Sequence, residues 1–239
     1  MSGLPYKRIL LKLSGERMSR SGSSNVLSMS SISHLADEII SLHEEGSEIG
    51  VVLGAGNILR GSEAAEVGFE EAQGHSMGML ATVINALALQ SVLEQKGKYT
   101  RVMSAVPMES FAEPYIRRRA IRHMEKGRIV IFAGGTGNPF FTTDSAGALR
   151  AVEVGADLLI KGTQVDGIYT ADPKKDSSAK HLSDISYKDI LVDDLKVMDG
   201  AAIALCRENK MPLMVCSLED KGNLLKAIKG ETKRTLVTA

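Results

Sequence analysis

The sequence predicts an α/β fold: a single-domain, doubly wound and mostly parallel sheet sandwiched between helices. Short apolar runs alternate with helical patterns along the 239 residues, and neither an internal repeat nor a long linker interrupts them. Strands that alternate with helices pair in parallel through right-handed crossovers, and the helices then cover both faces of the sheet. We therefore expect residues 1–239 to form one domain.

The predicted strands are short apolar runs, as is typical of strands buried on both faces. In chain order they cover residues 7–13, 49–53, 101–105, 129–133, 157–160 and 212–216, and an edge strand is expected at 235–237. Each of the first five precedes a helical pattern or a glycine-rich segment, which is the order expected of a parallel sheet.

The predicted helices place apolar residues three and four positions apart. They cover residues 31–45, 76–95, 113–126, 143–154, 196–209 and 223–229. Serines can cap the first of them, and Gly46 ends it. The helix at 76–95 is apolar almost all round, so we expect burial on two sides, against the sheet and against another subunit.

Two segments lack a clear apolar period. The serine-rich residues 17–31 predict a mobile loop, and the polar residues 174–189 predict an irregular excursion on the surface. The basic cluster Arg117, Arg118, Arg119 and Arg122 predicts a solvated helix face, with a regulatory anion site as the alternative.

Composition excludes several classes of protein. Lys plus Arg number 29 and Asp plus Glu also number 29, so no net field draws the chain to nucleic acid or to a membrane. The longest apolar runs fall far short of the roughly 20 residues that span a bilayer, and no signal peptide is evident, so we expect a soluble, cytoplasmic protein. Cys206 and Cys216 are expected to be inert thiols, and the five histidines show no metal-binding spacing.

Polar and glycine-rich segments follow four of the predicted strands. They are the segment from Lys12 through Leu13, Ser14 and Gly15 to Glu16; the turn Gly54, Ala55, Gly56 and Asn57, with Arg60 beyond it; residues 136–144; and Lys161, Gly162 and Thr163. In a parallel sheet these positions share one edge, and ligands of open α/β sheets bind at that edge. The segments therefore predict a single crevice.

Glycine loops at this edge suit phosphate groups, because glycine lets backbone N–H groups approach an anion and a following helix adds its dipole. Any one of these loops alone is better explained as a turn. Several together, with Lys12, Arg60 and Lys161 nearby, indicate an anion site. The chain has no P-loop motif, and the spacing of Gly54, Gly56 and Gly61 does not fit the dinucleotide-binding fingerprint.

Two charged residues stand out at this crevice. Lys12 lies in an apolar strand, where its ammonium group either meets an anion at the strand end or snorkels to solvent. Asp144 begins a predicted helix, where it can cap the helix, and it can equally orient Lys12 or contact phosphate-bound magnesium through water; these roles are compatible.

Five motifs resemble those of one enzyme family. KRILLKLSGE, GAGN with Arg60-Gly61, MGMLAT, TGNPFFTTDSA and KGTQVDGIYTADP are similar to the bacterial uridylate kinases (UMP kinases) of the amino-acid-kinase family. The resemblance covers essentially the whole chain in order. TGNPFFTTD is specific to the uridylate kinases, whereas the lysine and glycine elements are shared with acetylglutamate, glutamate, aspartate and carbamate kinases.

The resemblance implies roles for individual residues. It assigns catalysis to Lys12, Arg60 and Asp144, with Lys161 as a lesser candidate; ATP binding to Lys12, Leu13, Ser14, Gly15, Gly56, Arg60, Thr163, Tyr169 and Asp172; and UMP binding to Ala55, Thr136, Gly137, Asn138, Pro139, Phe140, Phe141, Thr142 and Thr143. Three features depart from the family pattern: Ala55 replaces a glycine, His75 replaces an aspartate that contacts the UMP ribose, and residues 19–25 replace a glycine-rich loop linked to GTP activation.

The implied activity is transfer of the γ-phosphoryl group of MgATP to UMP in pyrimidine nucleotide biosynthesis, giving UDP and ADP. The resemblance further implies a homohexamer, Mg²⁺ carried by ATP rather than by a protein site, and UTP (as inhibitor) or GTP as effectors, without a membrane or nucleic-acid partner. Two alternatives stay open: a related kinase acting on a carboxylate or carbamate, and a non-catalytic nucleotide sensor or nucleic-acid-binding regulator. The hypothesis requires Lys12 and the Asn138-Pro139 turn to reach the same cleft.

Overall fold

The computed structural model describes residues 3–19, 25–60, 68–173 and 175–239. Across these residues a nine-stranded sheet runs in the order β4-β3-β5-β2-β1-β6-β10-β11-β9. Its strands are β1 (Arg8–Leu13), β2 (Glu48–Leu53), β3 (Thr100–Ser104), β4 (Glu113–Pro114), β5 (Ile129–Ala133), β6 (Leu158–Thr163), β9 (Asp184–Ser186), β10 (Leu213–Ser217) and β11 (Thr235–Thr238). All neighbouring pairs are parallel except β10 with β11.

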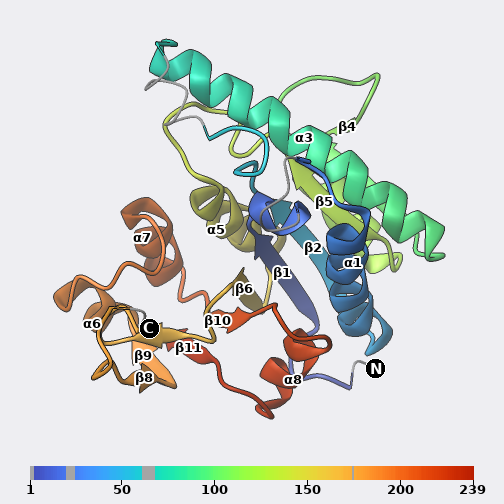
Figure 1. Cartoon of the computed structure of the whole chain (residues 1–239). Helices are drawn as coiled ribbons and strands as arrows, with labels where there is room; N and C mark the ends of the chain where they lie inside the picture. The colour runs from blue at the N-terminus through green and yellow to red at the C-terminus, as the bar shows by residue number, and fades with distance from the viewer. Residues whose placement is uncertain (1–2, 20–24, 61–67, 174) are drawn as a thin grey trace.

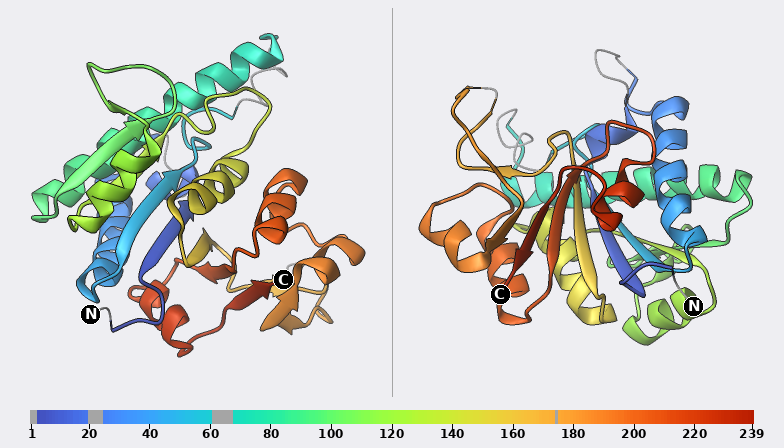
Figure 2. Two further views of the ribbon diagram at one scale, coloured as in Figure 1. Left: turned by 180° about the vertical axis from the view of Figure 1, so that it is seen from behind. Right: turned by 90° about the horizontal axis from the view of Figure 1, so that it is seen from below.

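Helices cover both faces of this sheet, which confirms the predicted fold class (Figures 1 and 2). They are α1 (Met29–Glu44), α3 (Glu71–Gln95), α4 (Arg117–Glu125), α5 (Thr143–Val154), α6 (Tyr187–Val192), α7 (Gly200–Glu208) and α8 (Asn223–Lys229), with a short 3₁₀ helix η1 (Gly15–Met18). Buried residues of α1, α3 and α8 form one core cluster, and those of α4, α5 and α7 form the other.

Strand β1 shows how the sheet divides these two cores. Ile9, Leu11 and Leu13 belong to the cluster with α1 and α3, whereas Leu10 belongs to the cluster with α5. Side chains alternate between the faces of a strand, so Lys12 lies on the same face as Leu10, beneath α5. Its stem packs against Gly147 in α5, where a Cβ atom would lie only 3.1 Å from Lys12 Cβ. The alternation therefore directs the lysine toward the beginning of α5.

The structure corrects several of these expectations; for example, the helix expected at 76–95 begins at Glu71. The strand at 235–237 is not at the edge, because β9 pairs in parallel with β11. Residues 174–189, expected to be irregular, contribute β9 and β8 (His181–Leu182), which pairs with β7 (Ile168–Tyr169) in a separate two-stranded sheet. The helices expected from 113 and 196 begin at Arg117 and Gly200. Residues 20–24 of the expected mobile loop lie outside the described residues.

Two physical causes account for the corrections to the strands and to the helix expected from 113. Strands as short as β8 and β9 gain most of their stability from hydrogen bonds to a neighbouring strand, which local sequence does not identify. The chain before α4 is extended, with Ile116 at φ −128° and ψ 118°, and Pro114 pairs with Ser104 in β4. Proline disfavours the helical conformation of the residue before it, so the helix starts only after this strand.

Helix α3 is the longest element of the described residues and is apolar enough to cross a membrane by length and composition alone. The core helix of a soluble protein passes the same test, and 44% of the most apolar window of α3 is buried. Ala86 and Leu89 pack fully buried in the core, whereas Leu80 and Ile84 are about half exposed. The predicted burial on the sheet side is therefore present, and an apolar strip is left on the other side.

Glu38 of α1 is expected to contribute strongly to stability. Its carboxylate, 2% exposed, accepts hydrogen bonds from the backbone N–H groups of Gly222 and Leu224 at the beginning of α8. Replacing Glu38 by alanine leaves both N–H groups buried without a partner, and we expect a loss of about 2–3 kcal/mol in the free energy of unfolding. Urea denaturation measures this loss. Glu44→Ala, which removes an exposed partner of Lys98 from the same helix, is the matched control and should leave the midpoint unchanged.

Candidate active site

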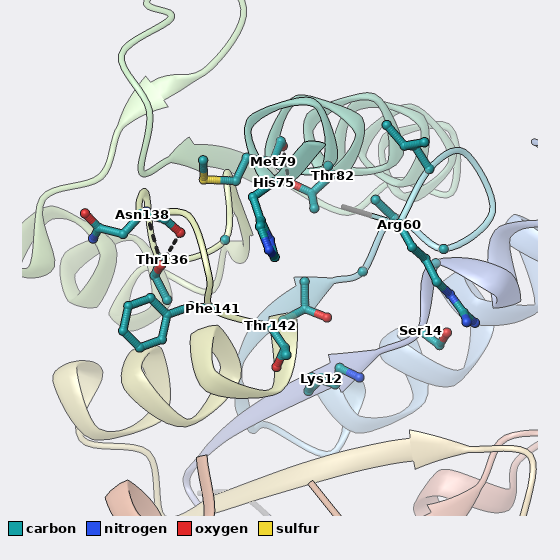
Figure 3. Close-up of a pocket in the computed structure, with 18 residues that line it drawn as sticks. Lys12, Ser14, Arg60, His75, Met79, Thr82, Thr136, Asn138, Phe141 and Thr142 are labelled. Atoms are coloured by element: carbon teal, nitrogen blue, oxygen red, sulfur yellow. Dashed lines mark hydrogen bonds between the residues drawn. The ribbon is translucent and has the colours of Figure 1, made fainter. Parts of the chain in front are cut away.

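The carboxyl ends of β1, β2 and β5 meet at a cavity of about 330 Å³, which α3 closes from above (Figure 3). Its lining includes eleven of the predicted site residues: Lys12, Ser14, Gly15, Ala55, Gly56, Arg60, Thr136, Asn138, Phe141, Thr142 and Thr143. Lys12 and Asn138 thus line one cavity, as the hypothesis requires. The convergence follows from parallel pairing, which brings the strand ends to one edge.

A second cavity, of about 630 Å³, lies on the other side of β6. Its lining includes the predicted residues Thr163, Tyr169 and Asp172, together with Lys161. Tyr169 donates a hydrogen bond of 2.6 Å to Asp166, and this bond raises the pKa of Tyr169 to about 12. The tyrosine is therefore neutral near pH 7, and its ring packs edge-on against His181.

Asp144 lies between Lys12, which lines the first cavity, and Lys161, which lines the second. Lys12 Nζ lies 2.5 Å from Asp144 Oδ1, and Lys161 Nζ donates a hydrogen bond of 2.6 Å to Asp144 Oδ2. Lys12 and Lys161 are cross-strand partners on β1 and β6, so the sheet register places the two ammonium groups side by side. One carboxylate between two ammonium groups leaves a net positive charge, and all three side chains are less than a fifth exposed.

Burial and the neighbouring charges both shift the pKa values of this triad. Burial raises the pKa of Asp144, but the positive charges of Lys12 and Lys161 outweigh it, so the pKa lies below its usual value. Burial also lowers the pKa of Lys161, and the charge of Lys12 adds to this effect, against the attraction of the Asp144 and Asp199 carboxylates. The second ammonium group is thus less stable than it would be alone with the carboxylate, and a bound anion would relieve the excess charge.

The side chain of Asp144 is not the one that caps α5. The cap is Thr142, whose hydroxyl accepts hydrogen bonds from the backbone N–H groups of Asp144 and Ser145 at 3.0 and 3.3 Å. The carboxylate of Asp144 is therefore free to face the two lysines. Its position in the first turn of α5 places it at the positive end of the helix dipole.

Sequence reasoning missed Asp199, which links α5 to α7. It caps α7 by accepting a hydrogen bond from Ala202 N at 3.0 Å, and it also accepts hydrogen bonds from the hydroxyls of Thr142 and Ser145. An aspartate directly before Gly200 and an apolar helix is a recognisable cap signal. From the sequence alone this cap was not identified, because the predicted helix begins at residue 196.

The loop after β5 requires its glycines. Gly134, Gly135 and Gly137 have φ values of +77°, +59° and +84°, in the left-handed region that other residues rarely adopt. A Cβ atom on Gly134 would also lie only 3.1 Å from Ser104 Oγ. The backbone N–H of Gly134 donates to Thr82 Oγ1 at 2.8 Å, so α3 holds the beginning of the loop.

Arg150 holds the same loop from α5 and was also missed. Its side chain is 5% exposed, donates a 2.5 Å hydrogen bond to Glu153, and lies 4.0 Å from the centre of the Tyr115 ring. A weaker hydrogen bond of 3.4 Å reaches the carbonyl of Gly135. An arginine among the small and apolar residues from Ala146 to Val152 was the available signal.

The remaining predicted residues lie around the cavity rather than in its lining. The side chain of Leu13 is buried in the core, so only its backbone is available there. Gly137 forms a turn by donating to Gly134 O at 2.9 Å, and Pro139 follows it. Phe140 is 62% exposed with φ +67°, and its ring centre lies 5.2 Å from that of His75.

Arg60 and His75 lie on opposite parts of the cavity wall (Figure 3). Arg60 is about half exposed and forms an ion pair with Glu16 beyond Gly15. His75 projects from α3, with Nε2 3.8 Å from Glu71 Oε1. Gly61 of the motif lies outside the described residues.

Cys206 and Cys216 are fully buried, and burial raises their pKa values to about 11 and about 12, in keeping with inert thiols.

Comparison with known proteins gives consistent results. The profile of the Amino acid kinase family matches residues 7–217. Uridylate kinases from Hyphomonas neptunium (strain ATCC 15444) and Rickettsia bellii (strain RML369-C) are 54% and 52% identical over 98% and 99% of this chain, covering 93% and 98% of their own lengths.

Solved structures show the same similarity. The crystal structure of UMP kinase from Bacillus anthracis matches with a TM-score of 0.94 at 40% identity, covering 98% of this chain and 96% of its own. That of UMP kinase from Ureaplasma parvum matches with a TM-score of 0.93 at 34% identity, covering 98% of this chain and 99% of its own. The chain therefore belongs to the amino acid kinase family and, within it, to the uridylate kinases.

Proposed function

We propose that this chain transfers the γ-phosphoryl group of ATP to the phosphate of UMP, giving UDP and ADP. The observation that carries the proposal is the triad of Lys12, Asp144 and Lys161, whose surplus positive charge lies between two cavities. Two phosphate groups brought together there would be held by the charge that the triad leaves unbalanced. The identity to uridylate kinases supports UMP as the acceptor.

The two cavities suit the two nucleotides. We assign the cavity with Thr136, Asn138 and Phe141 to UMP, and the cavity with Thr163, Tyr169 and Asp172 to the adenosine part of ATP. The loops at Ser14–Gly15 and Ala55–Gly56 line the first cavity close to Lys12 and would bind phosphate oxygens through backbone N–H groups. Leu13, Gly137, Pro139, Phe140, Thr142 and Thr143 complete the assigned positions.

The reaction needs little proton transfer. An oxygen of the UMP phosphate forms a bond to the γ-phosphorus as the bond from that phosphorus to the β–γ bridging oxygen breaks, and ADP leaves with the electron pair. A phosphate monoester has a second pKa of about 6, so the acceptor is already ionised near neutral pH. Catalysis is then a matter of alignment and charge. Lys12 and Arg60 neutralise the charge of the transferred group, and Asp144 orients Lys12.

Magnesium fits this site as a companion of ATP. Within residues 3–19, 25–60, 68–173 and 175–239, no group of three or more His, Cys, Asp or Glu side chains is arranged to hold a metal ion. Mg²⁺ in such enzymes is held by one or two carboxylates and the substrate phosphates. Asp144 would contact it through water, because both of its oxygens face lysine ammonium groups. When bound, Mg²⁺ would neutralise charge on the β- and γ-phosphates.

A substrate panel tests the proposed function against its alternatives. We expect ADP release from ATP with UMP, and little or none with simple carboxylates or carbamate; hydroxylamine would trap an acylphosphate but not UDP. CMP and dUMP in the same panel measure the strictness for base and ribose. Nucleotide binding without ADP release, or binding of duplex DNA at physiological salt, would instead favour the sensor or regulator.

Assembly and regulation belong to the same proposal. The half-exposed Leu80 and Ile84 on α3 suit a subunit contact, in keeping with a homohexamer built from dimers. We propose a single-domain cytoplasmic enzyme of pyrimidine nucleotide biosynthesis, with UTP or GTP as effectors. Residues 20–24 of the segment that departs from the GTP-linked loop lie outside the described residues, so adding GTP and UTP to the panel tests regulation directly.

A further inference from the structure

Asn85 is a polar residue in a position where an apolar one would be expected. It lies in α3 with 0% exposure, and the residues one helical turn away, Ala81 and Leu89, are buried in the core. An amide group in such surroundings costs free energy unless its hydrogen bonds are made. Packing alone therefore does not account for an asparagine at this position, and the partners of its amide group must be considered.

The amide of Asn85 is fully used by one loop. Its Nδ2 donates at 2.8 Å to the carbonyl of Gly54 and at 2.8 Å to Asn57 Oδ1, and its Oδ1 accepts from Asn57 Nδ2 at 3.0 Å. Asn57 Nδ2 also donates to the carbonyl of Val26 at 2.7 Å. The two asparagines thus hold both ends of the Gly54–Asn57 turn, at the beginning of the loop after β2, against α3.

This loop is in direct contact with the loop after β1. A Cβ atom on Gly15 would lie 2.5 Å from Gly54 O and 2.6 Å from Asn57 Oδ1, the same two atoms that Asn85 fixes. The N–H of Gly54 also donates to Leu13 O at 2.9 Å. Any shift of the second loop therefore moves against the first, which follows Lys12.

The same loop also contacts the two other groups at the cavity. A Cβ atom on Gly54 would lie 3.3 Å from Thr143 Oγ1, in the segment before Asp144. A Cβ atom on Gly56 would lie 3.1 Å from Arg60 Nε. Asn85 thus sits behind a loop that touches the Lys12 loop, the Thr143 segment and Arg60, without itself lining the cavity.

We infer that Asn85 is a positioning residue for phosphoryl transfer: through Gly54 and Asn57 it fixes the spacing between the two glycine loops that hold the donor and acceptor phosphates. This inference rests on the proposed function. In-line transfer depends on alignment, and a displacement of about 1 Å can cost about 100-fold in rate. The residues assigned to base and ribose, such as Phe141 and Tyr169, make no hydrogen bond to Asn85, so we expect binding of the separate nucleotides to change less than their alignment.

The test is Asn85→Leu, which keeps the size of the side chain nearly unchanged and removes its hydrogen bonds. We expect kcat with ATP and UMP to fall on the order of 10- to 100-fold. Dissociation constants of the separate nucleotides, measured by calorimetry, should stay within about threefold. Assays are run well below the unfolding midpoint of each variant, so that loss of folded protein does not contribute.

Two further variants make the outcome decisive. Asn57→Ala removes the same pairing from the loop side and should lower kcat similarly; it decides the question if Asn85→Leu does not fold. Asn223→Leu is the matched control, because Asn223 is also buried and donates to a backbone carbonyl, that of Ser217, at 2.8 Å, but contacts neither loop. It should lower stability and leave kcat unchanged.

Retention of normal kcat by Asn85→Leu and Asn57→Ala, with only a lower unfolding midpoint, would overturn the inference. So would an equal loss of kcat in Asn223→Leu, which would indicate general destabilisation. Failure of the proposed function looks different, because the wild-type protein itself would release no ADP with UMP. If another acceptor in the panel is used, the variants are compared on that acceptor; if none is used, both ideas fall.

Discussion

Replacing Lys12 by alanine is expected to reduce turnover with ATP and UMP by about 10²- to 10³-fold or more, while UMP still binds. Lys12 both lines the cavity and pairs with Asp144. Its loss removes charge stabilisation of the transferred group. The protein should still fold, because Asp144 keeps its hydrogen bond to Lys161. A coupled ADP assay measures turnover, and calorimetry measures UMP binding.

Two further variants serve as controls for this prediction. Lys12→Arg should not restore activity, because the ammonium group of Lys12 is buried 2.5 Å from Asp144 Oδ1, and a longer side chain with a planar guanidinium cannot occupy the same position. Lys96→Ala removes an ammonium group paired at 2.7 Å with Asp37 between α3 and α1, and should turn over normally. Near-normal turnover by Lys12→Ala would reject the role assigned to this lysine.

Asp144→Asn is expected to lower both activity and stability. The substitution leaves two buried ammonium groups facing each other without a carboxylate, and breaking a buried pair in this way costs about 3 kcal/mol or more. It also releases Lys12 from its orientation, so we expect kcat to fall by about 100-fold. Urea denaturation and the ADP assay measure the two effects on the same preparations.

The pH dependence of the stability difference tests the charge of Asp144. Its pKa is lowered in the folded protein, so the ionised form contributes stability above the unfolded value of about 3.9. That contribution disappears as pH falls through the lower, folded pKa. The gap between wild type and Asp144→Asn should therefore be full from about pH 5 to 7 and shrink below about pH 4. A difference in unfolding free energy that does not depend on pH would mean that the charge of the Asp144 carboxylate does not matter. Asp37→Asn, which removes a carboxylate from an exposed ion pair, is the control and should differ little from wild type at any pH.

Much of the site was predictable because parallel pairing converts position in sequence into position in space. Lys12, Gly56 and Thr136 are far apart along the chain, but each lies at or just after the end of a buried strand, and parallel strands end at one edge. The family motifs then named the nucleotides. The same reasoning does not resolve which side chains meet at that edge, since contacts of individual atoms depend on register and packing.

The partners of Asp144 illustrate this limit. Lys161 was a lesser candidate because its pairing with Lys12 across β1 and β6 is set by strand register, which sequence alone did not specify. Asp199 and Asn85 gave weaker signals: the first lay within a helix expected to start too early, and the second within an apolar pattern. Their roles emerge only when the elements around them are packed.

By itself, the sequence determined the types of the main elements, the layered α/β architecture and the sheet edge at which the glycine loops meet, because hydrophobic period and glycine placement act locally. Only the tertiary structure decided that β9 extends the sheet beyond β11, that Asp144 lies between two lysines, and that Asn85 holds a loop. These features depend on hydrogen bonds and ion pairs between residues distant in the chain. Such partners are chosen by the packing of whole elements, which no local pattern encodes.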